Sequence, residues 1–478
     1  MPRCFSALIT QIAILFVFAV CLCGRAAAQY FETRGDFPVG PPYEPVAIAI
    51  GDFNHDGKLD IAVTPYLSSA QISVMLGKGD GTFQTPTNYA VEQEPEGIAT
   101  GDLNGDGNLD LVVTNLLSNS ISVLLGNGDG TFQPARHISL HGSPEKVALA
   151  DLNNDGNLDI VVVDQAVTTI LGTGDGNFHS LVDNRSFGGF VTALTVGDFN
   201  HDGNMDVAIC GSFKTSDAAG VLLGNGDGTL QPAVNYLVGF SPQSIVTADF
   251  NRDGNLDLAV AALIGGAFYV LPGNGDGTFR AGSAYAAGFP TWLAVGDFNR
   301  DGIPDVVVAT SYTFLVGEIT PFLGNGDRTF VAGPNVGTGK EPAYVATGDF
   351  NGDKLPDVLV ADSLLSSVFC ILNTGVLGFS PSTPLVFPPQ KVGTTSSPQT
   401  VTLTNHGGSS VSISSIATTG DFHWSTTSCG SSLPAGASCQ ISVTFQPQKA
   451  GTQRGYLKIN DSASSKIQVV LLSGQGTP

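Results

Sequence analysis

The chain alternates short apolar runs with short polar segments that contain glycine. Residues 46–50 alternate in the two-residue period of a half-buried strand, whereas residues 110–114 form an unbroken β-rich run typical of a buried strand. A third type of run, such as residues 120–125, leads directly into a glycine-rich turn. The pattern of hydrophobic and polar positions therefore predicts an all-β protein.

Two short strings divide most of the chain into repeats. An acidic loop of nine residues, with Asp at positions 1, 5 and 9 and Asn at position 3, begins at Asp52, Asp102, Asp151, Asp198, Asp249, Asp297 and Asp349. A second string, Leu-Gly-Asn-Gly-Asp-Gly-Thr-Phe or a near variant, follows at residues 76–83, 125–132, 171–178, 223–230, 272–279 and 323–330, and in decayed form at 372–379. The period of roughly 50 residues has room for four short strands per unit.

Each unit reads as four antiparallel strands, A to D, with the acidic loop between A and B and the glycine-rich turn between C and D. Seven such units predict a closed seven-bladed β-propeller. The seventh unit stops after its third strand, near residues 370–372, whereas residues 31–39 at the other end align with a fourth strand. We therefore expect this N-terminal strand to complete the seventh blade, so that the ring has no exposed sheet edge.

The acidic loops carry the clearest chemistry. Positions 1, 3, 5 and 9 all supply side-chain oxygens, a glycine at position 6 permits a sharp turn, and the carbonyl at position 7 can add a ligand, as Ca²⁺ requires. We predict up to seven Ca²⁺ ions, one per loop. The expected ligands are Asp52, Asn54, Asp56, Asp60, Asp102, Asn104, Asp106, Asp110, Asp151, Asn153, Asp155, Asp159, Asp198, Asn200, Asp202, Asp206, Asp249, Asn251, Asp253, Asp257, Asp297, Asn299, Asp301, Asp305, Asp349, Asn351, Asp353 and Asp357.

Two other interpretations of these loops compete with a calcium site. An EF-hand needs a bidentate Glu at position 12, where all seven loops have Val or Ile, so we expect the ninth-position Asp to close the site. Asx-rich turns without metal remain the alternative. Arg252 and Arg300, at position 4, would place a cation near the metal unless they point outward. The Asp of each glycine-rich turn has too few partners in its spacing for a second metal site.

The composition changes after residue 379. Residues 380–478 are rich in Ser and Thr and contain alternating runs at 401–404, 411–416, 440–445, 455–459 and 467–472, which predict a β-sandwich of the immunoglobulin-like kind. Cys429 and Cys439 flank a loop there, and we expect them to form a disulfide in an exported protein. Cys210 and Cys370 lie in predicted strands of different blades, and we expect both to be buried free thiols.

Charge and the N-terminus narrow the class of protein. The net charge of −22, from 42 acidic and 20 basic residues, disfavours a nucleic-acid partner, although 21 of the acids belong to the acidic loops. Residues 1–28 have the features of a secretion signal: the positively charged Arg3 near the start, an apolar run, and small residues at 26–28. We expect a mature chain from about Gln29, exported to the extracellular space or cell surface, with no membrane span after signal removal.

The repeats resemble a known family. Asp-x-Asn-x-Asp-Gly loops followed by apolar runs, in seven units over residues 31–379, are similar to the FG-GAP or VCBS repeats of integrin α-subunit propellers and secreted bacterial proteins. The resemblance implies a seven-bladed propeller with Ca²⁺ in the loops and a role in adhesion or carbohydrate binding. Residues 380–478 resemble the choice-of-anchor D or ASH-type modules, through Cys429 and residues 433–436, 438–446 and 472–476, which implies a spacer or attachment role.

A binding role is favoured over catalysis. The sequence has no HExxH, GxSxG, P-loop or dinucleotide motif, and only seven histidines. On the face opposite the acidic loops, one position per blade carries Ala47, Gly97, Lys146, Ala193, Ser244, Trp292 and Tyr344. Trp292 and Tyr344, beside Phe289 and Glu341, form a candidate ligand platform; the alternative is that both aromatic residues merely plug the central channel.

The domains predicted are therefore a signal peptide (1–28), a propeller (29–379) and a sandwich (380–478). The predicted function is a secreted, calcium-binding, non-catalytic binding or adhesion protein, expected to be monomeric, whose ligand is an extracellular protein or carbohydrate. A polysaccharide lyase or glycosidase, and a purely structural surface protein, are the alternatives that the sequence leaves open.

Overall fold

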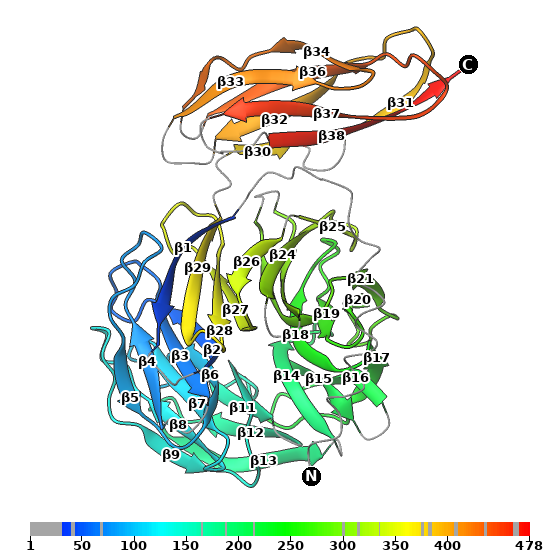
Figure 1. The fold of residues 1–478 in the computed structure, drawn as a ribbon. Coiled ribbons are helices and arrows are strands. Elements are labelled where there is room, and N and C mark those ends of the chain that lie inside the picture. The colour runs from blue at the N-terminus through cyan, green and yellow to red at the C-terminus, as the bar shows by residue number, and fades with distance from the viewer. Residues whose placement is uncertain are drawn as a thin grey trace, which may run out of the picture.

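The computed structural model describes residues 31–478 except 40–43, 67–69, 164–165, 187–188, 214–215, 299–301, 313–315, 334, 374–376, 381–384, 406–409, 435–436 and 462–467. All regular elements in these residues are strands, as predicted. Six four-stranded sheets and one five-stranded sheet are arranged like the blades of a propeller, and a two-sheet sandwich follows them (Figure 1). No helix in the described ranges is suited to crossing a membrane. The predicted secretion signal, residues 1–28, lies outside the described residues.

The first three sheets follow the chain in simple order. They are β2 (Glu44–Gly51), β3 (Asp60–Tyr66), β4 (Gln71–Met75) and β5 (Thr87–Ala90); β6 (Pro95–Gly101), β7 (Asp110–Asn115), β8 (Ser120–Leu124) and β9 (Arg136–Ser139); and β10 (Lys146–Ala150), β11 (Asp159–Val163), β12 (Ala166–Gly172) and β13 (Phe178–Ser186).

The next three sheets repeat this order. They are β14 (Phe190–Gly197), β15 (Asp206–Phe213), β16 (Ser216–Leu222) and β17 (Val234–Leu237); β18 (Pro242–Ala248), β19 (Asp257–Ala262), β20 (Ala267–Leu271) and β21 (Ser283–Ala286); and β22 (Pro290–Gly296), β23 (Asp305–Tyr312), β24 (Val316–Gly324) and β25 (Phe330–Ala332), with β26 (Val336–Gly339) also paired to β24.

The seventh sheet joins the two ends of the ring. It has the order β1 (Phe31–Pro38), β29 (Ser367–Asn373), β28 (Asp357–Asp362) and β27 (Pro342–Gly348), so the N-terminal strand is its outermost member. This pairing confirms the predicted latch strand. The innermost strands of successive sheets contact one another around the ring, and β27 contacts β2, which closes the circle.

The core of the ring lies between neighbouring sheets. The inner and middle strands carry the aliphatic side chains that pack against the next sheet, which is why β3, β7, β11 and β19 are buried along their whole length or nearly so. In four blades the fourth strand starts later than the sequence suggests. The last residue of the glycine-rich turn, such as Phe83, forms only an isolated bridge there, and the regular strand begins four residues later. Strands β13 and β25 instead begin at this phenylalanine, Phe178 and Phe330.

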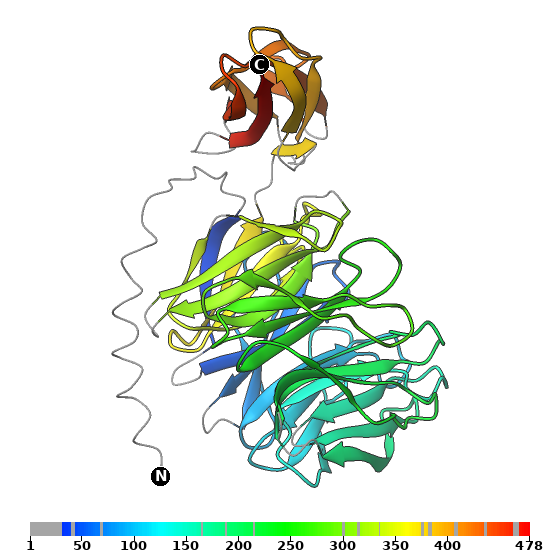
Figure 2. The same ribbon diagram turned by 90° about the vertical axis from the view of Figure 1, so that its right-hand side faces the viewer.

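The sandwich consists of two sheets with a common apolar core (Figure 2). One sheet has the order β30 (Leu377–Ser380), β32 (Gln399–Asn405), β36 (Ser438–Phe445) and β34 (Phe422–Thr427). The other has the order β31 (Leu385–Lys391), β38 (Gln468–Thr477), β37 (Gly451–Asp461), β33 (Val411–Thr418) and β35 (Ser432–Leu433). The five predicted sandwich strands all lie within this set.

One predicted boundary is wrong by a few residues. Residues 377–379 were assigned to the propeller as the remnant of a seventh glycine-rich turn, but β30 pairs with β32 and therefore belongs to the sandwich. The apolar residues of this segment are compatible with a strand of the propeller or of the sandwich. The pairing with β32 assigns the segment to the sandwich. The cysteine predictions are confirmed: Cys429 and Cys439 form a disulfide, and Cys210 and Cys370 are buried free thiols.

Candidate functional site

Each acidic loop folds around its own side-chain oxygens. In the first loop, Asp52 accepts hydrogen bonds from the backbone amides of Asp56 and Gly57 (3.1 and 2.8 Å), and Asn54 accepts a second bond from the Asp56 amide (2.9 Å). The same arrangement recurs in the loops that begin at Asp151, Asp198 and Asp249, and in closely similar form at Asp102. The oxygens therefore point into the loop, and each keeps a lone pair for a further partner.

The ninth-position Asp of every loop is fully buried. In the first loop Asp60 accepts a bond from the Phe53 amide (2.9 Å) through one oxygen and from the Gly77 amide (2.7 Å) through the other. This residue therefore ties the acidic loop to the glycine-rich turn of its own blade. The equivalent residues, Asp110, Asp159, Asp206, Asp257, Asp305 and Asp357, make the same two bonds.

Burial raises the pKa of these ninth-position carboxyls. The pKa rises to about 6 for Asp60, Asp110 and Asp206 and to about 7 for Asp357, with desolvation as the main cause and the loop's other two aspartates as a further one. The two backbone hydrogen bonds oppose this rise. The three carboxylates of a loop are thus close enough to repel one another.

The donor set fits a hard cation in kind, because it consists of three carboxylates and an amide oxygen. As the side chains stand, however, no three Asp, Glu, His or Cys residues in the described part of the chain are drawn together around one point. The loop oxygens are instead held by backbone amides. The predicted ligands Asn299 and Asp301 lie outside the described residues, as does Arg300.

The seventh loop departs from the motif. Lys354 occupies position 6, where the other six loops have glycine, and it adopts the left-handed conformation (φ 67°) that glycine adopts elsewhere. Its amide still donates to Asp349 (2.8 Å). This exception is visible in the sequence, where Lys354 replaces the glycine of the other six loops.

The variable position 4 links neighbouring loops. His55 contacts Asn108 of the second loop (2.9 Å), and Asn154 and His201 make matching contacts to the fourth and fifth loops. Arg252 donates from Nε to the carbonyl of Gly302 in the sixth loop (2.9 Å). This side chain therefore points toward the next blade. In these four loops the position-4 residue bridges two blades, a role that sequence spacing alone did not reveal.

The glycine-rich turns are held by their own aspartates. Asp80 accepts bonds from the amide and hydroxyl of Thr82 (3.0 and 2.6 Å), which lowers the pKa of this exposed carboxyl. Gly79 and Gly81 both have positive φ, as the equivalent glycines of other blades do. This geometry agrees with the interpretation of these segments as turns.

The predicted aromatic pair lies at the mouth of the central channel. Trp292 and Tyr344 contact each other with ring centroids 4.6 Å apart, and the Lys146 ammonium lies 5.8 Å from the Trp292 ring. Lys146 also pairs with Glu96 (2.7 Å). Both aromatic residues line a cavity of about 60 Å³, together with Ala47, Gly97, Lys146 and Ala193, so the blade-to-blade register predicted from the sequence is correct.

This cavity is too small for a sugar ring, since one water occupies about 30 Å³. Burial raises the pKa of Tyr344 to about 12, in keeping with an apolar environment. Phe289 is 48% exposed on the rim, and the Glu341 backbone amide donates to Asp362 (3.1 Å). The geometry favours a channel plug.

Replacing Trp292 or Tyr344 by Ala is expected to destabilise the propeller by about 2–4 kcal/mol, because each removes a packed ring from the channel. Phe289→Ala is the matched control, since this ring is half exposed and its loss should cost at most about 0.5 kcal/mol. Urea unfolding of the three variants measures this difference. Equal and small effects for all three would contradict the plug.

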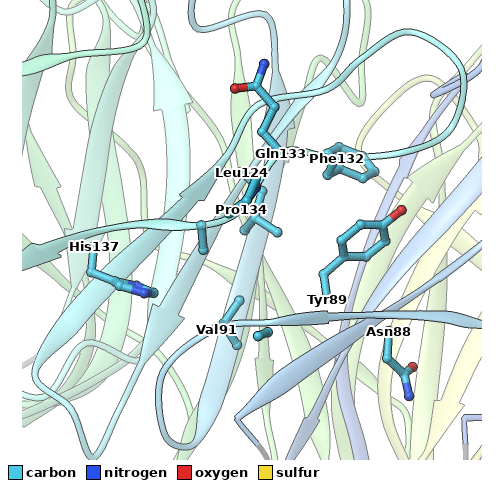
Figure 3. Close-up of a pocket in the computed structure, with 10 residues that line it drawn as sticks. Asn88, Tyr89, Val91, Leu124, Phe132, Gln133, Pro134 and His137 are labelled. Atoms are coloured by element: carbon cyan, nitrogen blue, oxygen red, sulfur yellow. The ribbon is translucent and has the colours of Figure 1, made fainter.

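A larger pocket, of about 350 Å³, opens on the outer wall between the first two blades (Figure 3). Figure 3 shows the Tyr89 ring directed toward Phe132, with ring centroids 5.5 Å apart, while His137 lies to one side. The same contact recurs as Tyr236 with Phe279 and as Tyr285 with Phe330. The aromatic contact in the wall of this pocket is therefore a feature of the repeat.

The pKa values of the ninth-position aspartates predict a pH dependence. Unfolded aspartate titrates near pH 3.9, whereas four of these carboxyls titrate near pH 6–7 in the metal-free fold. The folded state therefore binds protons more tightly, and stability falls as pH rises through this range. We expect the metal-free protein to melt at a higher temperature at pH 5 than at pH 8.

Calorimetry of dialysed, metal-free protein measures this trend. Asp357→Asn should flatten it, whereas Asp80→Asn should not, because the lowered pKa of Asp80 keeps that group ionised throughout the window. A melting temperature that rises from pH 5 to pH 8 would contradict the assignment.

Comparison with known proteins agrees with this architecture. FG-GAP-like repeats are matched at residues 52–113, 102–162, 151–209 and 250–308, and an ASH domain, described as Abnormal spindle-like microcephaly-assoc'd, ASPM-SPD-2-Hydin, is matched at residues 375–469. The chain thus combines FG-GAP-like repeats in a propeller-like fold with an ASH, immunoglobulin-like domain. No curated protein matches the sequence significantly.

Among solved structures, BBS1N in its complex with ARL6DN is similar, with a TM-score of 0.50 and 11% identity over 72% of this chain and 96% of that one. The ASH / PapD-like domain 7 of human CEP192 matches at 19% identity over 21% of this chain and 85% of that one, with a TM-score of 0.17. A functionally unknown protein from Desulfotomaculum acetoxidans matches at 14% identity over 67% of this chain and 89% of that one, with a TM-score of 0.44. At these identities the likeness concerns fold alone. The matched repeats and the ASH domain suggest a non-catalytic binding or structural protein.

Proposed function

We propose that this chain is an exported binding protein whose propeller is stabilised by Ca²⁺ and docks a protein partner on the rim opposite the acidic loops. We call this surface, made of the B-to-C hairpins and the D-to-A connections, the hairpin rim. Export rests on the leader at residues 1–28, and the sandwich serves as spacer or attachment module. The exposed apolar side chains of the hairpin rim carry the proposal.

These side chains are concentrated on one face. Of the large apolar residues exposed in the described part of the propeller, eight belong to the hairpin rim and three to outer strands, and none lies in an acidic loop or glycine-rich turn. Contiguous exposed apolar surface on a folded protein marks an interaction site. The eight are Leu117, Phe190, Phe240, Ile264, Phe289, Val316, Leu364 and Leu365.

The densest part of the rim is held by backbone hydrogen bonds. The Ile264 amide donates to the Phe240 carbonyl (3.2 Å), and the Ala287 amide donates to Gly266 of the same hairpin (3.0 Å). Phe240, Ile264 and Phe289 are therefore adjacent and preorganised, and they are 71%, 71% and 48% exposed. A rigid patch loses little conformational entropy when it is covered.

Another sector of the rim, in the first three blades, is acidic. Burial raises the pKa of Tyr66, and Glu94, Glu96, Glu44 and Glu145 add to this rise, which places four carboxylates of three blades around one ring. A rim that carries an apolar patch in one sector and carboxylates in another complements a protein surface that has both apolar and basic residues. Five of the eight exposed apolar side chains of the rim are aliphatic, which favours a protein over a glycan partner, since glycan sites rely on open aromatic faces.

Calcium would be held by the oxygens of positions 1, 3, 5 and 9, with Asp52, Asn54, Asp56 and Asp60 as the first set. When bound, the ion supplies positive charge to a loop of formal charge −3. The protein's own residues hold this first loop in place. The buried Asp60 binds it to its own blade, and His55, at position 4, binds it to the next blade.

Site-specific photo-crosslinking in the producing cells tests the docking face. A benzoylphenylalanine at Phe240, on the rim, is compared with one at Leu237, which is 74% exposed on the outer strand β17. We expect protein adducts from position 240 alone, and their loss when Ile264→Asp is added. Adducts removed by glycosidase but not by protease would replace the protein partner with a glycan. Equal adducts from both positions would overturn the docking face.

A further inference from the structure

One glycine-rich turn carries a cation where the others carry glycine. The fifth residue of the Gly-Asn-Gly-Asp-Gly string is Gly81, Gly130, Gly176, Gly228 and Gly277 in the first five blades, all with φ between 75° and 85°. In the sixth blade this residue is Arg328, with φ 68°. A long side chain in the left-handed region is unfavourable, so its retention calls for a compensating interaction.

The position of these turns explains where the arginine side chain goes. Each turn packs against the acidic loop of the preceding blade. The Gly130 amide donates to the Phe53 carbonyl of the first loop (2.9 Å), and the Gly277 amide donates to Phe199 of the fourth loop (3.0 Å). A side chain at this position of the sixth turn therefore emerges beside the fifth loop.

Arg328 pairs with two predicted ligands of that loop. Its Nη2 atom lies 2.5 Å from Asp253 Oδ2, and its Nε atom lies 3.4 Å from the Asp257 carboxylate. Asp253 and Asp257 are positions 5 and 9 of the fifth loop. The guanidinium is only 20% exposed, and the Tyr285 hydroxyl donates to the Arg328 carbonyl (2.6 Å), which anchors the turn.

The fifth loop is distorted in the way that this contact predicts. Asp257 accepts the bond from its position-2 amide, Phe250, at 3.3 Å, whereas the other six loops show 2.8–2.9 Å. The bond from Asp257 to the Gly273 amide keeps its normal length of 2.8 Å. The guanidinium thus competes for the oxygen that faces the loop interior.

We propose that Arg328 is the built-in cation of the fifth acidic loop and excludes Ca²⁺ from it. A guanidinium that touches two of three carboxylates neutralises part of their charge, occupies their oxygens and repels a divalent ion. The inference rests on the proposed binding of Ca²⁺ by the other loops. The chain then holds at most six ions in seven loops.

The first loop provides a contrast. Lys58 pairs with Asp56 there (3.0 Å), but its side chain is 42% exposed and no ion pair joins it to the buried Asp60 in the described structure. A flexible, hydrated ammonium on one exposed carboxylate can swing away when a metal binds. Arg328 is planar, more buried and fixed by a neighbouring blade, so it stays.

Calcium stoichiometry tests the inference. Wild-type protein, Arg328→Gly and Arg328→Lys are equilibrated with ⁴⁵Ca²⁺ as the probe, and bound ions per chain are counted by equilibrium dialysis. We expect Arg328→Gly to bind one ion more than wild type, because it restores the residue of the other turns. Arg328→Lys should recover part of this extra binding, because a flexible ammonium can swing away when the metal binds.

A reciprocal variant, which adds an arginine to another turn, provides a second test in case one variant fails to fold. Gly277→Arg places a guanidinium beside the fourth loop and is expected to lose one ion, with circular dichroism and a cooperative melt as the check on folding. If Gly277→Arg does not fold, the calcium-dependent rise in melting temperature is compared between Arg328→Gly and wild type, and the rise should be larger in the variant.

Two results would overturn the proposal in distinguishable ways. Equal, non-zero counts for wild type and Arg328→Gly would show that Arg328 does not exclude the ion, while the calcium proposal stands. Zero counts for every protein would overturn the calcium proposal itself and this inference with it.

Discussion

Removal of calcium is expected to lower the melting temperature of the propeller by roughly 10–20 °C. At calcium concentrations ten- to a hundredfold above Kd, each site stabilises the fold by about 1.4–2.7 kcal/mol, and six sites contribute on the order of 10 kcal/mol. Unfolding a domain of this size changes entropy by about 2.1 cal/mol/K per residue, which converts that free energy into the stated shift. Without metal, each acidic loop keeps three mutually repelling carboxylates.

Differential scanning calorimetry in EGTA and in millimolar CaCl₂ measures this shift. Sodium chloride at matched ionic strength is the control, because simple screening of the −22 charge acts in the same direction as metal binding. The sandwich has no acidic loop, so its own transition should not move. Identical melts with EGTA and calcium would leave the loops as Asx turns held by their backbone hydrogen bonds.

Deletion of the latch strand is expected to destabilise the whole ring by more than 5 kcal/mol. Strand β1 pairs with β29 along residues 31–38, and Phe31 is fully buried against Phe298, with ring centroids 5.6 Å apart. The deletion removes this core residue, at a cost of about 3–5 kcal/mol for the aromatic side chain alone, and leaves β29 as an open edge. The melting temperature of the propeller should fall, and the chain should aggregate more readily.

Two point variants separate the contribution of the buried Phe31 side chain from that of the strand as a whole. Phe31→Ala should reproduce most of the loss, whereas Thr33→Ala, at an exposed position of the same strand, should stay within about 0.5 kcal/mol of wild type. Urea unfolding of both variants and of the deletion provides the comparison. An unaltered transition in the deletion would mean that the ring closes without its latch.

The repeat could be predicted from the sequence because every unit contains the same loop, which is held by hydrogen bonds within itself. Loop residues at positions 1, 3 and 5 bond to amides within their own nine-residue segment, so their roles follow from spacing. The latch strand was readable for a similar reason, since residues 31–39 are the only unit fragment left when the others are aligned. The disulfide between Cys429 and Cys439 joins residues ten positions apart, and this is again a local feature.

Contacts that an acidic loop makes outside its own nine residues could not be predicted in this way. The ninth aspartate was expected as a metal ligand, yet in the structure it is first a buried anchor between its loop and a turn 17 residues further along. The bridge from His55 to Asn108 and the ion pair from Arg328 to Asp253 span 53 and 75 residues. Their partners could not be named from the sequence, because strand pairing within a blade and packing of adjacent blades bring these residues together.

The sequence by itself determined the all-β class, the repeat, the latch, the disulfide and the donor set of each acidic loop, since all of these follow from local pattern and composition. The three-dimensional structure was needed to show that Leu377 begins the sandwich, that Trp292 and Tyr344 line a cavity too small for a sugar ring, and that the apolar residues gather on the hairpin rim. The physical reason is distance along the chain. A loop's own hydrogen bonds depend on a few neighbouring residues, whereas the surface that a partner meets depends on which blade lies beside which.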